Sequence, residues 1–359
     1  MRRLIAGWGT VLAFALFGGD LLSESTLDKW PLEVLLFAWI LGVILWCAFG
    51  VVVEADHLAE MLGEPLGTLI LTLSIVVIEV MLISAVMLGG GGSPTVGRDT
   101  MFAVIMIVLN GVVGLSLVIG GIRHHTQEYS LEGASAYLVV IIPLATIALI
   151  MPSVTRSTSD ETLSTTQAIL FSLATAALYA IFLIIQTGRH RDLFTLEEGD
   201  EHRPEERSPR AIARHTVLLV ATVLPIVLLA KRLDKVVSHG IHDIGAPVAL
   251  SGVLIALIIF TPEGVSALKA AYANKLQRTV NLCLGACLST VGLTLPAVLT
   301  IGLITGRDVL LGLDPSGIVL IALTLLLSVV TFSGPRTTVL AGAVHLLVFF
   351  VYLVLIFSP

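Results

Sequence analysis

Long apolar stretches separated by short polar breaks run through the whole chain. Each stretch is close to the roughly 20 residues that an α-helix needs to cross a hydrocarbon core of about 30 Å. The pattern therefore predicts an all-α polytopic membrane protein with about eleven transmembrane helices. The predicted helices lie near residues 4–22, 31–53, 66–88, 101–122, 134–153, 166–186, 211–230, 246–271, 279–304, 316–333 and 337–357.

The composition supports a bilayer as the surroundings of the chain. Of its 359 residues, 56% are hydrophobic and only 13% are charged, and the mean hydropathy is +0.99, far from the balance of a soluble domain. The three cysteines are an odd number and lie inside apolar stretches, which argues against a disulfide framework. We expect the lipid bilayer and small inorganic cations as partners, and no nucleic acid.

One long polar stretch, residues 188–210, divides the chain near its middle. Between Glu197 and Glu206 it carries six acidic residues and a single basic residue, Arg203. This composition predicts a mobile loop, with a patch that concentrates cations as the alternative. Thirteen of the 20 Lys and Arg residues fall on the same side as the N-terminus, which predicts a cytoplasmic N-terminus. We expect the bacterial inner (plasma) membrane as the location.

The two halves on either side of this loop each contain one carboxylate deep in an apolar helix. Glu79 lies in "IVVIEVMLI" and Glu263 lies in "IIFTPEGVSA". Since the helix with Glu263 comes five predicted helices after the helix with Glu79, it enters the membrane from the opposite side, which predicts an inverted repeat. The predicted organisation is an extra N-terminal helix (1–30), a first five-helix repeat (31–187, with its core near 62–122), the acidic loop (188–210) and a second five-helix repeat (211–359, with its core near 245–304).

The two acids are the strongest candidates for a cation and proton site. An ionisable group at the centre of a membrane helix costs about 2.5–3.5 kcal/mol on insertion scales, a cost that Leu at the same position would avoid. A single buried Glu can be a protonated structural residue, but two at equivalent positions favour a shared site for a metal cation or a proton. The candidate polar neighbours are Thr72, Ser84, Asn110, Thr261, Ser289 and Thr290. For any single Ser or Thr, a hydrogen bond to its own helix is the simpler explanation.

Proton and cation should compete at such a site. Low dielectric favours the neutral form of a buried carboxyl group, and a bound cation reverses that preference. Two carboxyl groups close together would titrate as a coupled pair. Pro262, directly before Glu263, is expected to break its helix and free backbone carbonyls as further ligands.

The chain resembles the calcium/cation antiporter superfamily and, within it, the ChaA-type branch of the cation/proton exchangers. "LGEPLG" at 62–67 leading to Glu79 is similar to the first repeat of that family. The resemblance implies efflux of cations driven by inward proton flow through alternating access, adds Ser266 to the candidate site, and implies no cofactor. The second repeat is matched by Glu263, Ser266-Ala267, Asn274-Lys275, Leu284-Gly285 and Pro296, in that order.

The chain departs from the family pattern at positions that matter for the transported cation. Polar residues expected just before the two acids and in the fourth helix are replaced by Val76-Val77, Phe260-Thr261 and Met106-Ile107. Ca²⁺ takes six to eight oxygen ligands, so the thinner site also suits Na⁺ or K⁺, and the resemblance implies all three.

Two other functions and the oligomeric state stay open at this stage. A channel with the acids as a filter is the second hypothesis. An intramembrane enzyme is the third, but the sequence lacks the Ser-His pair or paired membrane aspartates of intramembrane proteases. The sequence leaves the oligomeric state open, a homo-oligomer included.

Overall fold

The computed structural model describes residues 2–62, 66–87, 93–156, 162–188, 191–194, 208–334 and 336–358, without the side chains of residues 59, 60, 66–72 and 191. Part of the "LGEPLG" motif and nearly all of the acidic loop, including residues 197–206, therefore lie outside the described residues. The same holds for the side chain of Thr72, although its backbone belongs to a helix.

The prediction of an all-α membrane protein is confirmed. In the described part of the chain, nine helical segments are long and apolar enough to span a membrane, and two shorter apolar helices bring the set to the eleven predicted. The segments are α1 (Arg2–Leu21), α3 (Trp30–Leu62), α4 (Leu66–Met87), α5-η1-α6 (Val96–Ile105, Met106–Val112, Val113–His124), α7-η2-α8 (Leu131–Ala145, Thr146–Ile150, Met151–Val154), α9 (Thr165–Thr187), α10 (Pro209–Asp243), α11 (Ala249–Tyr272), α12-η4-α13 (Leu276–Ser289, Thr290–Thr294, Leu295–Thr305), α14 (Pro315–Thr331) and α15 (Val339–Phe357).

The remaining elements are short. They are α2 (Glu24–Leu27), the 3₁₀ turn η3 (Arg191–Leu193), and the strands β1 (Gln127–Glu128) and β2 (Arg336–Thr337), which pair antiparallel. Tyr129, next to β1, donates its hydroxyl hydrogen to the carbonyl oxygen of Gly334. Burial raises the pKa of Tyr129 to about 12, so the phenol remains a donor at neutral pH.

Two helices are longer than the apolar pattern predicts. The predicted end of α3 was near residue 53 and that of α10 near residue 230, but the helices continue to Leu62 and Asp243. The reason is that polar residues at their ends pair across the two helices: Glu54 of α3 lies 2.6 Å from His215 of α10, and Glu33 lies 3.0 Å from His239. Apolar periodicity does not detect such polar helix ends.

The chain forms two compact units that interleave along the sequence. Unit 1 consists of residues 1–96 and 202–262, and unit 2 of residues 97–201 and 263–359. The boundary between them cuts α11 between Pro262 and Glu263. The two five-helix repeats are a division along the sequence that these units do not follow, and they stay a prediction.

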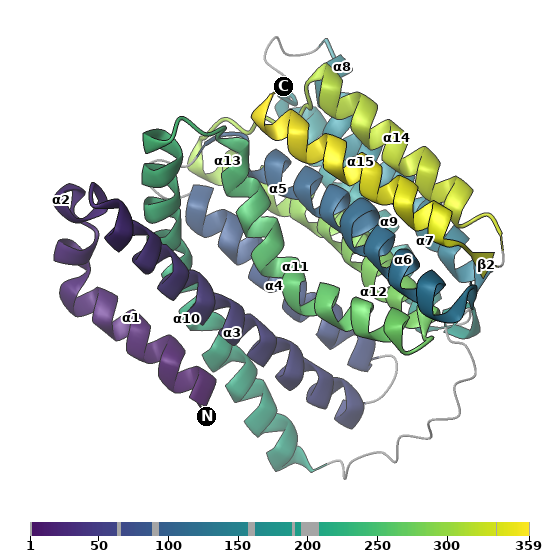
Figure 1. Cartoon of the computed structure of the whole chain (residues 1–359), viewed down its shortest axis with the longest axis horizontal. Helices are drawn as coiled ribbons and strands as arrows, with labels where there is room; N and C mark the ends of the chain where they lie inside the picture. Colours follow the sequence, from purple (N-terminus) through teal and green to yellow (C-terminus); the bar gives the residue numbers. More distant parts are fainter. Residues whose placement is uncertain are drawn as a thin grey trace. The chain divides into compact units, whose positions relative to one another are not determined.

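Unit 1 is built around the antiparallel pair of α3 and α10, with α1 and α4 packed against them (Figure 1). The indole N–H of Trp8 in α1 donates to the carbonyl oxygen of Ala221 in α10, 3.0 Å away. The absence of a side chain at Gly7 allows this approach, because a Cβ there would lie 2.9 Å from Cys47 Sγ and 3.0 Å from Pro225. Small residues at helix contacts are typical of membrane proteins.

Unit 2 contains a closely packed pair of helices, α6 and α15 (Figure 1). A Cβ on Gly342 of α15 would lie 2.6 Å from the carbonyl oxygen of Gly114 in α6, and one on Gly121 would lie 2.6 Å from Val339. The glycines therefore bring the two backbones together. Three segments of unit 2, η1, η2 and η4, are π-helical turns within otherwise α-helical spans.

Candidate functional site

Glu79 is buried in α4, with 1% of its surface exposed. The helix has an exposed side that includes Leu73, Val77 and Met81, whereas Glu79 lies with Ile83 on the buried side. Side chains four residues apart share a helix face. The Glu79 carboxylate therefore lies on the face opposite the one that lipid would cover.

Glu263 is also buried, with 8% of its surface exposed, and it lies in the second half of α11. The predicted helix break at Pro262 is wrong, because α11 continues through this proline without interruption. A proline has no N–H, so the carbonyl oxygen of Ile258, one turn earlier, still lacks its normal helical donor. Ser266, half-buried, follows Glu263 by about one turn.

Cys283 of α12 lies close enough to Glu263 for an electrostatic interaction. Neither Cys283 nor Cys287 forms a disulfide, and both are buried, as expected for residues that fill space between helices.

The two glutamates belong to different units, Glu79 to unit 1 and Glu263 to unit 2. Each is buried inside its own unit's helix, at the positions that the sequence pattern selected.

Three of the candidate hydroxyl groups donate to their own helices. Ser84 donates to the carbonyl oxygen of Val80 (2.5 Å), Thr261 to that of Leu257 (2.5 Å) and Ser289 to that of Ala286 (3.0 Å). Such bonds use the hydroxyl hydrogen and leave oxygen lone pairs available. These residues keep the capacity to bind a cation, but their geometry is that of ordinary helix residues.

Asn110 is fully buried and lies in the π-helical turn η1. Its amide nitrogen donates to Thr324 Oγ1 of α14 at 2.8 Å, and its amide oxygen lies 3.1 Å from His345 Nδ1 of α15. His345 Nε2 in turn lies 2.9 Å from Thr331 Oγ1. The predicted site residue is therefore the centre of a polar network that joins three helices.

The Asn110 amide oxygen fixes the tautomer of a neutral His345 ring. An amide oxygen can only accept a hydrogen bond, so Nδ1 carries the hydrogen and Nε2 accepts from Thr331. His345 and Thr324 are not among the site residues that the sequence pattern predicts. The available signal was a fully buried, ionisable side chain in the middle of the last apolar helix.

Thr290 is buried at the first position of the π-helical turn η4. The helices that contain η1 and η4 are the ones that follow the two acidic helices in the sequence, and both π-helical turns include a predicted polar site residue. π-Helical turns are rare and occur frequently at functional sites. The two halves thus share an acidic helix followed by a helix with a π-helical turn.

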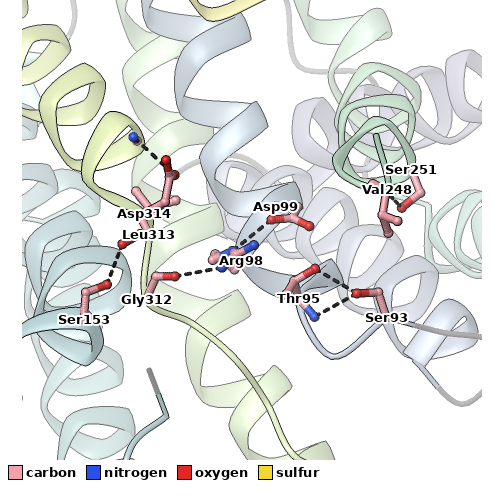
Figure 2. Close-up of polar contacts among 11 residues, drawn as sticks. Ser93, Thr95, Arg98, Asp99, Ser153, Val248, Ser251, Gly312, Leu313 and Asp314 are labelled. Atoms are coloured by element: carbon pink, nitrogen blue, oxygen red, sulfur yellow. Dashed lines mark hydrogen bonds and ion pairs between the residues drawn. The ribbon is translucent and has the colours of Figure 1, made fainter. Parts of the chain in front are cut away.

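A second polar cluster of unit 2 lies at the start of α5 (Figure 2). Arg98 binds Asp99 at 2.9 Å and donates to the carbonyl oxygen of Gly312, also at 2.9 Å. Ser153 donates to the neighbouring carbonyl oxygen of Leu313 at 2.7 Å, and Asp314 caps α14 by accepting from the backbone N–H groups of Ser316 and Gly317. These contacts fix the position of the segment before α14.

Comparison with known proteins identifies the family. The family described as sodium/calcium exchanger protein matches residues 32–188 and 214–358. The chain belongs to the sodium/calcium exchanger protein family. Members of this family are ion transporters and not enzymes, and their transported cations are substrates, so no cofactor is expected.

Relatives of this exchanger family member cover most of its length. The sodium-potassium/proton antiporter ChaA of Escherichia coli (strain K12) is 41% identical over 320 residues, which is 88% of this chain and 87% of the relative. The structure of native YfkE superimposes with a TM-score of 0.75 at 17% identity, covering 99% of this chain and 100% of the other. The H⁺/Ca²⁺ exchanger CAX superimposes with a TM-score of 0.70 at 14% identity, covering 98% and 89%. At these identities the two structures support the fold alone.

Proposed function

We propose that the chain is a secondary active antiporter that moves Na⁺, K⁺ or Ca²⁺ out of the cell in exchange for inward H⁺. The observation that carries the proposal is the burial of two carboxyl groups, Glu79 and Glu263, in helices that the sequence pattern predicts to be equivalent. Neither packing nor helix propensity favours an ionisable group there, whereas a site that binds a cation and a proton in turn requires one.

In this mechanism the two carboxyl groups bind the cation when ionised and release it when protonated. Low dielectric raises the free energy of an ionised carboxyl group that holds no cation. The site therefore binds either a cation or protons while its opening changes from one side of the membrane to the other. This coupling distinguishes exchange from leakage. Alternating access would let the same residues face the two sides of the membrane in turn.

The choice of cation follows from the number of oxygen ligands. The positions next to the two acids carry Val76-Val77 and Phe260, which offer no side-chain oxygen, and the amide oxygen of Asn110 already accepts from His345. Few side-chain oxygens are therefore left for Ca²⁺, which takes six to eight. Together with the similarity to a sodium-potassium/proton antiporter, this supports Na⁺ and K⁺ as the first substrates to test.

The test is transport in proteoliposomes that contain the purified protein, a pH-sensitive dye and an imposed pH gradient. Addition of Na⁺, K⁺ or Ca²⁺, one at a time, should dissipate the gradient, and the rate should show competition between H⁺ and the cation. A cation current without proton movement would instead support a channel. An unchanged gradient with all three cations would contradict the proposal.

A further inference from the structure

Four side chains of unit 1 form a cluster where the ends of α2, α3 and α10 meet. Glu33 lies in the first turn of α3, Asp28 is the C-terminal cap of α2, and His239 and Asp243 lie one turn apart near the end of α10. His239 Nδ1 lies 3.0 Å from Glu33 Oε1 and 3.6 Å from Asp243 Oδ2, and Nε2 lies 3.4 Å from Asp28 Oδ1. Both ring nitrogens therefore face carboxylates.

The centre of the cluster is a structured part of unit 1 and not a group of freely moving surface side chains. The side chains of Glu33 and His239 are only 13% and 19% exposed. Gly240 leaves space for the Glu33 carboxylate, because a Cβ at this position would lie 3.1 Å from Glu33 Oε1. The α10 backbone at Gly240 thus leaves room for the carboxylate of Glu33, which His239 contacts.

The cluster has an excess of negative charge. Three carboxylates surround one imidazole, and in the described part of the chain none of them forms an ion pair with a lysine or arginine. Even a protonated His239 leaves the group with a net negative charge. A divalent cation would neutralise this excess where a single imidazole does not.

We propose that Glu33, His239 and Asp243 form a binding site for a divalent transition-metal cation of the Zn²⁺ type. One ligand atom from each of the three residues lies within 4.8 Å of the others. Two ligands on a tetrahedral Zn²⁺ are roughly 3.3 Å apart, given bond lengths of about 2.0–2.2 Å, and the observed separations of 3.0 and 3.6 Å from His239 Nδ1 bracket that value.

The fourth residue, Asp28, completes a known arrangement of metal sites. When Nδ1 of a histidine binds the metal, Nε2 carries the hydrogen and donates it to a carboxylate, which orients the ring. Asp28 Oδ1 faces Nε2 at 3.4 Å. An imidazole ligand favours Zn²⁺, Ni²⁺ or Cu²⁺ over Ca²⁺, Na⁺ and K⁺, so this site would not take the transported cations.

A bound metal would connect α10 to the start of α3. Glu33 and the pair His239 and Asp243 come from helices that pack along each other in unit 1, and the ion would fix their ends together. With the predicted cytoplasmic N-terminus these ends lie on the outer side of the membrane, so the ion would come from outside the cell.

The test is equilibrium binding of Zn²⁺ to the purified full-length protein, carrying a tag without histidine, in competition with a chromophoric chelator. We expect one Zn²⁺ per chain, retained in an excess of Ca²⁺. His239→Ala should weaken binding at least tenfold, and Asp28→Asn about 10–100-fold, as for residues that orient a ligand. The matched control is His242→Ala, since this histidine is exposed on the same helix.

A native chain that binds no Zn²⁺, or a His239→Ala variant that binds as tightly as the native chain, would overturn the proposal. Asp243→Asn serves if the histidine variant fails to fold, because the Asp243 side chain is 47% exposed and its replacement leaves the helix contacts intact. Retained tight binding in that variant would likewise overturn the site. The readout is metal binding and not transport, so its result is independent of the proposed exchange activity.

Discussion

His345 in α15 and Asn110 in the π-helical turn η1 are joined by a hydrogen bond of 3.1 Å between fully buried side chains. With Thr324 and Thr331 they connect three membrane helices of unit 2. An interhelical hydrogen bond in a membrane contributes about 0.6 kcal/mol on average and up to about 1.7 kcal/mol. The network stabilises the position of a residue that the sequence selected as a ligand.

The His345→Leu substitution should lower the free energy of unfolding by about 1–3 kcal/mol, because it leaves the Asn110 oxygen and the Thr331 hydroxyl buried without a partner. Thermal unfolding of the purified protein in detergent measures this loss. Leu347→Ala, on the exposed side of the same helix, is the control and should change stability much less. Equal stability of His345→Leu and the native chain would show that the network does not contribute.

Glu79→Gln and Glu263→Gln should each reduce cation/proton exchange at least tenfold while the protein remains folded and inserted. A neutral amide is easier to bury than a carboxylate, but it cannot take up or release the proton. Proteoliposome transport under a pH gradient measures the rate, and size-exclusion chromatography checks folding. Glu132→Gln, an exposed acid in the first turn of α7, is the matched control. Native exchange rates in either glutamate variant would remove that residue from the site.

Deletion of residues 197–206 should leave transport measurable, because this acidic segment lies outside both predicted repeats. The expected change is confined to the dependence of the rate on cation concentration. Transport by the deletion variant and the native chain, compared at matched amounts of folded protein, measures the effect. Complete loss of transport in a well-folded variant would show that the segment belongs to the transport machinery.

Single cysteines at Gly91 and Ala273 should react with a membrane-impermeant reagent from the outside and the inside, respectively. Corresponding helices of the two predicted repeats are five helices apart in the sequence, so the corresponding loops lie on opposite sides. The structure favours Ala273 over Asn274 for the inner position, because Asn274 has φ = 62° and its side chain accepts from Gln127. The three native cysteines are replaced first.

Labelling before and after permeabilisation distinguishes the two sides in this experiment. Reaction of both positions from the same side would contradict the inverted repeat, and with it the pairing of Glu79 with Glu263. If neither position reacts before permeabilisation but both react afterwards, both loops lie inside. This result would also contradict the inverted repeat.

The helices could be predicted because a bilayer imposes one length on every apolar segment. The same argument could not find the polar ends of α3 and α10, since those ends are stabilised by pairs such as Glu54 with His215 that are far apart in the sequence. It also could not predict that α11 continues through Pro262, because the effect of a proline depends on the helices packed around it.

The burial of Glu79 and Glu263 could be predicted, since an isolated acid in an apolar helix has few alternatives to the protein interior. The role of Asn110 could not. Its partners Thr324 and His345 lie more than 200 residues away, and the π-helical turn that presents it leaves no pattern in the sequence. Single polar residues in apolar helices are therefore predictable as buried but not as ligands or structural partners.

The interleaving of the two units has a consequence for biosynthesis. Trp8 and Ala221 are 213 residues apart, yet they join α1 to α10. A ribosome adds roughly 5–20 residues per second, so α1, α3 and α4 wait on the order of 10 s for α10 to emerge. During that interval the glycine and polar surfaces that α10 will cover face lipid, the translocon or an insertion chaperone. Nascent chains that end before Pro209 should therefore be the ones that membrane proteases remove most rapidly.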